Sequence, residues 1–364
     1  MPLLKLYFEK LLYSPLEFPK FMKQIEKDNV RIVTQIAKAH IIMSSYLSIL
    51  KKHANRFGSK KKYLLWTHEP YHDFTFIPKI KTNNNAKIYI MNVYTGDVFT
   101  HNFRYFYFNE LLTIYQLSKT EDSHTPIFEL NKQLNIEFSH PDFKKLLIKD
   151  KLMSKVKSTP RPVVALSTYY SKKYYQGNLH TSLPKRYELI EYGYLNGYLD
   201  LYGKGWDKHP TVKIVENSRN NGDRRQTKNE ILPRYLFNLC LENVDYPYYV
   251  TEKIWEPIKN GCLPIYYSNT TIYQVFPENS FVDYRDFDNP EQLYKYLDNM
   301  TKHEYFERLN RCIEAFNHVI DQGNNTTFDG HSTNSNINYL EYETCYKSLS
   351  EKIKYIGASI LKGK

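Results

Sequence analysis

The sequence predicts two α/β domains in tandem, each with its own mostly parallel sheet. Three observations lead to this fold class. The chain has 364 residues, which suits two domains of roughly 100–200 residues each. Short apolar runs of strand length alternate with helix-like segments in both halves of the chain. Between the halves lies a basic segment that ends in Pro160 and Pro162, and these prolines disfavour helix and suit a connection.

The first half of the chain contains the elements of one such domain. Apolar runs rich in β-branched and aromatic residues predict strands, and the segments between them have helical spacing. The expected strands span residues 31–34, 40–43, 63–66 and 86–93, and the expected helices span residues 19–27 and 46–56. In such a sheet, ligands bind beyond the carboxyl ends of the strands, so the cleft between two such domains is the expected site.

The same alternation restarts after the prolines. Strands are expected at residues 163–167, 199–202, 234–241 and 262–267, and helices at 183–191, 251–260, 290–300 and 303–317. Gly261 stands directly after one of these helices, a position that favours glycine. Pro257 falls inside the same helix, which we therefore expect to kink or to break after one turn. These patterns place the domains at residues 1–158 and 159–343, with a closing helix in residues 344–364.

The chain is basic, with a formal net charge of +11 from 50 basic and 39 acidic residues. A basic protein attracts nucleic acid, anionic membranes or phosphorylated small molecules, and the charge alone does not choose among them. Two basic clusters stand out: Arg56 with Lys60, Lys61 and Lys62, and Arg224 and Arg225 with Lys228. The first is interpreted as a solvated strand edge, with nucleic acid or lipid binding as the alternative. The second lies in a Gly/Asn-rich segment and is interpreted as a mobile surface loop, or else a loop near a nucleotide.

The cysteines and the hydropathy of the sequence indicate in which cellular compartment the protein is expected. The four cysteines form no C-x-x-C pair, and Cys240 and Cys262 lie in apolar runs that predict buried, reduced thiols. No run approaches about 18 consecutive apolar residues, so no transmembrane segment is expected. Charged residues interrupt the first twelve positions, which excludes a signal-peptide core there. We therefore expect a cytoplasmic protein.

The segment from residue 237 to residue 267 has the chemistry of a phosphate site. An apolar strand ends in Glu242-Asn243, and a helix is expected to begin near Thr251. Helix N-termini present free N–H groups and partial positive charge, which suit phosphate. Lys253 in the first turn is unfavourable for the helix dipole unless an anion is bound, and Glu252 beside it could accept hydrogen bonds from sugar hydroxyls. The alternative is an ordinary strand–helix–strand unit with a surface Glu–Lys pair.

This segment resembles the signature segment of the α1,3-fucosyltransferases in both order and spacing. Three blocks carry the resemblance, namely Glu242-Asn243, Tyr249-Val250-Thr251-Glu252-Lys253 and Leu263-Pro264-Ile265. The strand at residues 164–167, Arg186 ahead of the Leu201-Tyr202-Gly203 turn, and residues 281–287 also match the family's pattern. The resemblance covers residues 163–309 and fades in the first 150 residues and in the tail.

The resemblance implies a GT-B fold, in which two Rossmann-like domains face each other and the second holds GDP-fucose. It also implies roles for six donor-binding residues. Arg186 and Lys253 would neutralise the diphosphate, Asn243 and Tyr249 would hydrogen-bond the phosphate and nearby groups, Glu252 would hold the fucose ring, and Ser167 would contact a phosphate. This segment contains no Asp-x-Asp motif, so we expect side-chain cations and no obligatory metal, although a divalent cation could stimulate the reaction. A soluble bacterial or viral type is expected.

An inverting transfer also needs a carboxylate that takes the proton of the acceptor hydroxyl. The candidate is Glu69, which follows the strand at residues 63–66 and resembles the family's N-domain glutamate. The alternative is that Glu69 only occupies an exposed turn before Pro70, with Asp73 as the next candidate base. His68 is interpreted as a loop histidine.

The expected function is therefore transfer of fucose from GDP-fucose to a hydroxyl of a GlcNAc-containing glycan, in α1,3 linkage. The expected partners are GDP-fucose and the glycan acceptor, without nucleic acid. Three alternatives stay open at this point: a GT-B transferase that uses another nucleotide sugar, a basic nucleic-acid-binding protein, and an inactive relative that only binds glycans.

Overall fold

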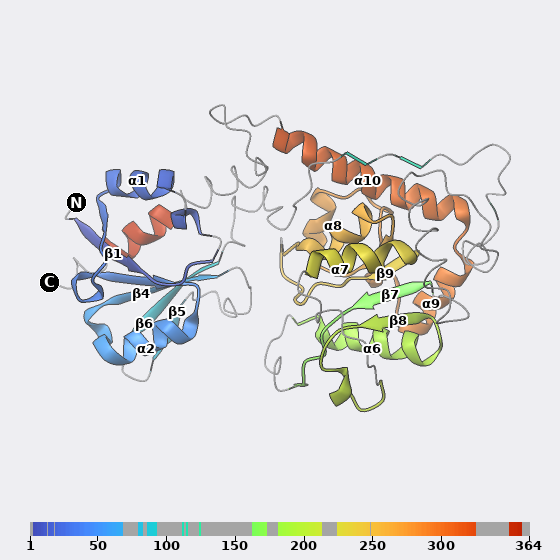
Figure 1. Ribbon diagram of the computed structural model, residues 1–364, viewed down its shortest axis with the longest axis horizontal. Helices are drawn as coiled ribbons and strands as arrows, with labels where there is room; N and C mark the ends of the chain where they lie inside the picture. Colours follow the sequence, from blue (N-terminus) through green and yellow to red (C-terminus); the bar gives the residue numbers. More distant parts are fainter. Residues whose placement is uncertain are drawn as a thin grey trace. The chain divides into compact units, whose positions relative to one another are not determined.

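A computed structural model gives the fold of the chain (Figure 1). It describes residues 3–12, 14–17, 19–67, 79–82, 86–92, 111–112, 114–115, 124, 162–172, 181–212, 224–247, 249–324 and 349–358. The chain forms two compact units: the first is Met1–Arg104 with Thr326–Lys364, and the second is Tyr105–Asn325. The expected boundaries at residues 158 and 343 lie outside the described residues.

The first unit contains a sheet in the order β2-β1-β3-β4-β6-β5, in which only β5 runs antiparallel to its neighbour. The strands are β1 (Leu4–Phe8), β2 (Val30–Ile32), β3 (Ile41–Ser44), β4 (Lys62–Thr67), β5 (Lys79–Lys81) and β6 (Lys87–Asn92). The four strands expected from the sequence are confirmed, with ends shifted by one or two residues. The expected transition from strand to polar turn after residue 66 is seen as the end of β4 at Thr67.

The helices of the first unit are α1 (Pro19–Lys27), α2 (Leu47–Phe57) and the segment of residues 349–358 near the end of the chain. Side chains of α2 such as Leu50 and Ala54 pack into a buried core with Tyr63, Leu65 and Ile88 of the sheet. Residues 349–358 contact the turn after α1, where Ser350 Oγ donates to Asp28 Oδ2 at 2.8 Å and Lys354 Nζ lies 3.3 Å from Asp28 Oδ1.

The second unit contains an all-parallel sheet in the order β11-β10-β9-β7-β8. The strands are β7 (Val163–Leu166), β8 (Leu199–Tyr202), β9 (Phe237–Leu239), β10 (Leu263–Tyr266) and β11 (Val282–Asp283). The first strand of this unit in chain order, β7, lies between β8 and β9. The strand order therefore reverses between β7 and β9, which is where open α/β sheets bind their ligands. The prediction of two α/β units with mostly parallel sheets is confirmed.

The helices of the second unit cover both faces of this sheet. They are α6 (Leu183–Leu195), α7 (Arg224–Ile231), α8 (Glu252–Lys259), α9 (Pro290–Asn299) and α10 (Lys302–Asn324). In Figure 1, α6 lies on one side of β7 and β8, and α7, α8 and α10 lie on the other. Trp255 of α8 packs against Phe276 and against Phe316 of α10, with ring centroids 5.0 and 6.3 Å apart. This aromatic contact anchors the helix that begins at Glu252.

Three local predictions can be compared with the structure of this unit. Gly261 has φ +72°, a left-handed conformation that glycine adopts without penalty, and this confirms its place after α8. Pro257 does not break α8 after one turn, because the helix continues to Lys259 and the Pro257 carbonyl accepts from Cys262 N at 2.9 Å. Arg224 and Lys228 do not lie in a surface loop as expected; they belong to α7.

The described cysteines Cys240, Cys262 and Cys312 are buried free thiols, as expected for the first two. Within the described part of the chain, no helix combines the length and the apolar character that crossing a membrane requires.

Candidate active site

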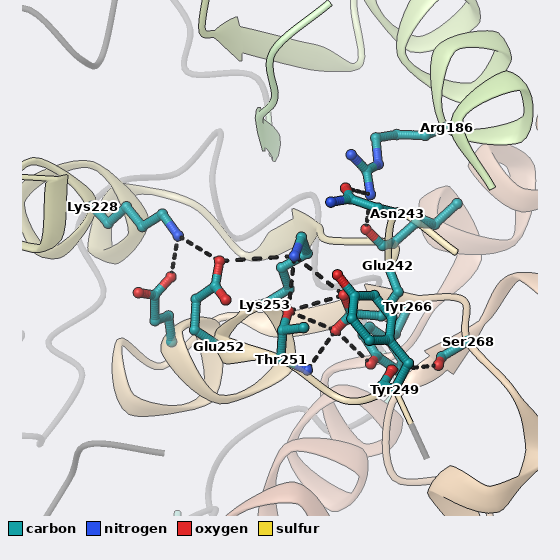
Figure 2. Close-up of polar contacts among 12 residues, drawn as sticks. Arg186, Lys228, Glu242, Asn243, Tyr249, Thr251, Glu252, Lys253, Tyr266 and Ser268 are labelled. Atoms are coloured by element: carbon teal, nitrogen blue, oxygen red, sulfur yellow. Dashed lines mark hydrogen bonds and ion pairs between the residues drawn. The ribbon is translucent and has the colours of Figure 1, made fainter. Parts of the chain in front are cut away.

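The carboxyl ends of β7 and β9 place two short polar segments side by side, because the two strands are neighbours and parallel. Ser167 and Thr168 follow β7, and Glu242 and Asn243 follow β9. Arg186, in the first turn of α6, reaches across to the second segment. Its Nη2 donates to the main-chain oxygen of Leu241 and to Asn243 Oδ1 at 2.9 Å (Figure 2). The structure thus brings together Arg186 and Asn243, which the sequence assigned to one site.

Glu242 is a buried carboxylate at the centre of this site, with none of its surface exposed. It accepts from the amide and the hydroxyl of Thr251, both at 2.8 Å, and from Tyr266 Oη at 2.9 Å. Lys253 Nζ lies 3.1 Å from its second oxygen. A buried charge is tolerated only when it is paired and hydrogen-bonded, and Glu242 is both. The carboxylate therefore ties the end of β9 to β10 and to the start of α8.

Lys253 is held in place by this carboxylate. Its Nζ lies 2.8 Å from Thr251 Oγ1 and 3.8 Å from Glu252 Oε1, in addition to the ion pair with Glu242. Burial lowers the pKa of Lys253, but the nearby carboxylates of Glu242 and Glu252 outweigh burial and hold the pKa above its ordinary value. The ammonium therefore stays charged throughout the physiological range.

Glu252, the first residue of α8, stays ionised as well. Burial raises the pKa of Glu252, but the ammonium groups of Lys253 and Lys228 outweigh burial and lower the pKa to about 2. Lys228 Nζ lies 3.7 Å from Glu252 Oε1 and forms an ion pair with Glu256 one turn further along α8. These contacts form a row of alternating charges: Glu256, Lys228, Glu252, Lys253 and Glu242. Figure 2 labels the last four of them.

Tyr249 lies in the segment between β9 and α8, and its side chain is buried. Its main-chain oxygen accepts from Ser268 Oγ at 3.1 Å, which fixes this segment against the turn after β10 (Figure 2). The sequence reasoning assigned Tyr249 to the donor site as a hydrogen-bonding side chain, and that role stays a prediction.

Three hydroxyls at this edge are buried and have no hydrogen-bond partner among the described residues: Ser167 Oγ, Thr168 Oγ1 and Ser182 Oγ. Ser182 is the residue before α6, and its main-chain amide donates to the main-chain oxygen of Asn243 at 3.0 Å. A buried hydroxyl without a partner costs about 1–3 kcal/mol, so such groups are expected where a polar ligand supplies the partner. These hydroxyls lie on the segments that flank Arg186 and Asn243.

The backbone of Ser167 is held by the turn after β8. Trp206 Nε1 donates to the Ser167 oxygen at 2.7 Å, and Gly203 packs directly against the same carbonyl. A Cβ on Gly203 would lie 1.8 Å from that oxygen, and the residue has φ +150°. Only glycine allows this approach, so the glycine in the Leu201-Tyr202-Gly203 turn sets the position of Ser167.

The charges of this site favour an anionic ligand beside Arg186. Lys253 and Lys228 are each paired with carboxylates, whereas Arg186 contacts only neutral oxygen atoms within the described part of the chain. Arg186 as a whole is only 6% exposed, so its charge is poorly screened by water. The Thr251 amide at the start of α8 donates to Glu242 and so does not face a ligand. We therefore assign the main attraction for an anion to Arg186.

Two residues have roles here that the sequence reasoning did not assign: Glu242 as an anchor and Lys228 as a partner of Glu252. Lys228 was named only in the basic cluster for which a loop near a nucleotide was the alternative. For Glu242, the sequence offered one signal, which is its position at the end of an apolar strand. Nothing in the sequence connects residue 228 with residue 252.

The candidate base Glu69 and its neighbours His68 and Asp73 lie outside the described residues. Among the residues that are described, no three His, Cys, Asp or Glu side chains gather in a group that could hold a metal ion.

Comparison with known families gives a specific match in the second unit. Residues 189–311 match the family model "Glycosyltransferase family 10 (fucosyltransferase) C-term". The matched range contains β8, β9, α8 and β10, and therefore Glu242, Glu252 and Lys253. Arg186 and Ser167 precede it.

Curated relatives match over a short part of the chain. An α-(1,3)-fucosyltransferase B of Drosophila melanogaster is 40% identical over 70 residues, 19% of this chain, and α-(1,3)-fucosyltransferase FucT of Helicobacter pylori is 37% identical over 79 residues, 22% of this chain. A GDP-fucose protein O-fucosyltransferase 3 of Danio rerio is 35% identical over 77 residues, 21% of this chain. These matches span 16%, 16% and 17% of the lengths of the three relatives.

A solved structure of an α1,3-fucosyltransferase with GDP-fucose resembles the chain with a TM-score of 0.43 and 17% identity, over 96% of this chain and 90% of the other. A second structure, Anabaena Alr3699/HepE in complex with UDP-glucose, matches with a TM-score of 0.40 and 9% identity, over 95% of this chain and 99% of the other.

Proposed function

We propose that the chain, whose residues 189–311 match the family model of the glycosyltransferase family 10 (fucosyltransferase) C-terminal domain, transfers fucose from GDP-fucose to a glycan. The acceptor is a hydroxyl of a GlcNAc-containing glycan, the new linkage is α1,3, and the configuration at the sugar carbon is inverted. The observation that carries the proposal is the buried guanidinium of Arg186, which has no carboxylate partner in the described part of the chain.

On the donor side, the proposal gives each residue a role. Arg186 binds the diphosphate, and the buried hydroxyl of Ser167 donates to a phosphate oxygen. Lys253, which pairs with Glu242 and Glu252, also neutralises the diphosphate. Asn243 and Tyr249 hydrogen-bond the phosphate and nearby groups. Glu252 stays ionised and accepts hydrogen bonds from the hydroxyls of the fucose ring.

The reaction breaks the bond between the sugar carbon and the phosphate oxygen, and GDP leaves with the electron pair. The acceptor oxygen forms the new bond to the same carbon from the opposite face, and its proton passes to Glu69. Negative charge develops on the leaving diphosphate, so cations placed there stabilise the transition state more than the ground state. Arg186 and Lys253 supply this charge, and we propose that a divalent metal is not required.

The donor preference is tested by calorimetric titration with GDP, GDP-fucose, GDP-mannose, UDP-galactose and UDP-GlcNAc in the presence of a chelator. We expect both GDP and GDP-fucose to bind, and GDP-fucose to bind more tightly than GDP-mannose. Binding of a uridine donor would move the function to a transferase with another nucleotide sugar. Binding only after a metal is added would overturn the proposed role of the side-chain cations.

The reaction itself is tested with GDP-fucose and a GlcNAc-terminated or LacNAc oligosaccharide, followed by mass spectrometry and NMR of the product. An added deoxyhexose in α1,3 linkage is expected. Hydrolysis of GDP-fucose without transfer to any glycan would contradict the proposed acceptor.

A further inference from the structure

Lys228 reaches the candidate site from a helix that the sequence did not predict. It lies on α7, and its Nζ sits between two carboxylates of α8, at 3.7 Å from Glu252 Oε1 and in an ion pair with Glu256 (Figure 2). The Lys228 side chain is 24% exposed, and those of Glu252 and Glu256 are 27% and 10% exposed. The contact is therefore partly shielded from water, and the charges interact more strongly than a surface pair would.

Glu252 and Glu256 are four residues apart on α8, so their carboxylates face the same side of the helix. Two like charges at this spacing repel each other, and burial makes the repulsion worse. Burial, followed by the repulsion from Glu252, raises the pKa of Glu256 even though Lys228 acts in the other direction. Lys228 is thus the group that lets both carboxylates occupy one face of α8.

The effect of Lys228 on Glu252 differs from that of Lys253. Lys253 is bound to the buried Glu242 at 3.1 Å and lies 3.8 Å from Glu252, so the Glu242 ion pair fixes its position. Lys228 approaches Glu252 Oε1 from α7 and has no link to Glu242 among the described contacts. Both lysines contact Oε1 of Glu252. The ionisation and the orientation of the Glu252 carboxylate therefore depend on both lysines.

We propose that Lys228 is a positioning residue for the sugar of the nucleotide-sugar donor, acting through Glu252. This inference rests on the proposed function, because it takes Glu252 as the group that accepts hydrogen bonds from the donor sugar. Lys228 holds Oε1 of Glu252, and the carboxylate so positioned accepts from the ring hydroxyls. A bare nucleoside diphosphate has no such ring and binds at Arg186, so its affinity does not depend on Lys228.

A purely structural role would be different. Lys228 would then only fasten α7 to α8, as Asn229 does, whose Oδ1 accepts from Asn260 Nδ2 at 3.1 Å. Asn229→Ala removes that second link between the same helices without changing any charge. It is therefore the matched control for Lys228→Met.

The test compares the dissociation constants of GDP and GDP-fucose by calorimetry for wild type, Lys228→Met, Lys228→Arg and Asn229→Ala, with circular dichroism to check the fold. We expect Lys228→Met to weaken GDP-fucose about tenfold and GDP less than about twofold, since a lost charge-assisted contact has effects of this order. Lys228→Arg keeps the charge and is expected to recover most of the affinity. Asn229→Ala is expected to leave both constants unchanged.

The pH dependence provides the second readout. Removal of one of its two cations raises the pKa of Glu252 from about 2 toward the ordinary carboxyl value. The carboxylate accepts hydrogen bonds from the sugar in its ionised form, and this form is lost as the pH falls through the pKa of the group. The affinity of Lys228→Met for GDP-fucose is therefore expected to start declining at a higher pH than that of wild type, as the pH falls toward and below the ordinary carboxyl value of 4.5, whereas Asn229→Ala follows wild type.

Equal losses of GDP and GDP-fucose in Lys228→Met, or the same behaviour in Asn229→Ala, would overturn the inference and leave a structural link. If Lys228→Met does not fold, Lys228→Gln is measured in its place with the same expectations. Failure of the proposed function looks different, because wild type itself would then show no preference for GDP-fucose, and both proposals would fall together.

Discussion

At the scale of single residues, the cations of the site are not equivalent. Lys253 and Lys228 are each bound to carboxylates, while Arg186 contacts two neutral oxygen atoms. An incoming diphosphate would compete with a carboxylate at either lysine, and it meets no such competitor among the described residues at Arg186. The arginine should therefore contribute more to diphosphate affinity than either lysine.

Arg186→Ala is accordingly expected to weaken GDP binding by about 10- to 100-fold, because a hydrogen-bonded charge contributes about 1.5–3 kcal/mol and each 1.4 kcal/mol is tenfold. Calorimetric titration with GDP gives the measurement. Arg311→Ala is the control, since Arg311 is an exposed arginine of the same unit that pairs with Glu307 on α10. GDP affinity in Arg186→Ala that equals that of Arg311→Ala would show that the diphosphate binds elsewhere.

The candidate base is tested separately from the donor site. Glu69→Gln keeps the size of the side chain but cannot accept the acceptor proton. Turnover is expected to fall by roughly 10²–10⁴-fold, the usual effect of a lost general base, with GDP affinity nearly unchanged. Single-turnover transfer and GDP calorimetry on the same preparation measure both. Wild-type turnover in Glu69→Gln would direct attention to Asp73, and Asp73→Asn would then be measured in the same way.

The structure brings together several residues that the sequence had grouped, for identifiable reasons. The segment that contains Glu242, Asn243, Glu252 and Lys253 is continuous in the chain, and its order and spacing carried the information. Arg186 was found because its distance to a glycine turn matched a known pattern, and the structure brings it to Asn243. The contact between Lys228 and Glu252 was missed because it joins two helices, and such contacts leave no trace in the spacing of residues.

At the scale of elements, the site depends on turns that only glycine allows. Gly203, after β8, approaches the Ser167 carbonyl so closely that a Cβ would lie 1.8 Å from the oxygen. Gly197, before the same strand, has φ +79°, and a Cβ added there would meet no atom within 4 Å. The two glycines thus differ in what an added methyl group would displace.

Both Gly203→Ala and Gly197→Ala introduce a side chain at positive φ, with a backbone cost of about 1–3 kcal/mol. Only Gly203→Ala should also displace Ser167 and the Trp206 hydrogen bond, so only this variant should lose GDP affinity. Urea denaturation measures the stability of each variant, and calorimetry under folding conditions measures the affinity. Equal GDP affinity in the two variants would show that Ser167 does not contribute to the site.

Strands were easier to predict than short polar helices. The runs at β3, β4, β7 and β8 are apolar and β-branched, so their burial in a parallel sheet could be read directly. β1 was missed although Leu4 and Leu6 alternate with outward residues, because a five-residue strand at the start of the chain gives a short pattern. α7 was taken for a loop because residues 224–231 are mostly polar, and its position depends on ion pairs to α8.

At the scale of the whole molecule, each compact unit combines segments that are far apart in the sequence. In the second unit, Asn310 and Asn317 of α10 each exchange a pair of hydrogen bonds with the main chain at Tyr115 and Leu112. In the first unit, residues 349–358 contact Asp28 after α1. A proline-rich boundary in the sequence could not reveal either arrangement, because both depend on side-chain contacts over long separations.

This division gives a prediction about where a donor nucleotide stabilises the chain. A ligand that binds only the folded state at about 100 times its dissociation constant stabilises that state by about 2.7 kcal/mol. If GDP binds at Arg186, the gain appears in the second unit, and hydrogen exchange there slows. Mass spectrometry of exchange with and without GDP is expected to show added protection in β7, β9, α6 and α8, and little change in β1, β3 and α2. The elements of the first unit contain no residue assigned to donor binding.

Protection centred on β1 and β3 would instead place the nucleotide at the first unit, where the strand order changes at β1. The roles of Arg186, Glu252 and Lys228 would then have to be abandoned together, because all three depend on a donor bound between β7 and β9.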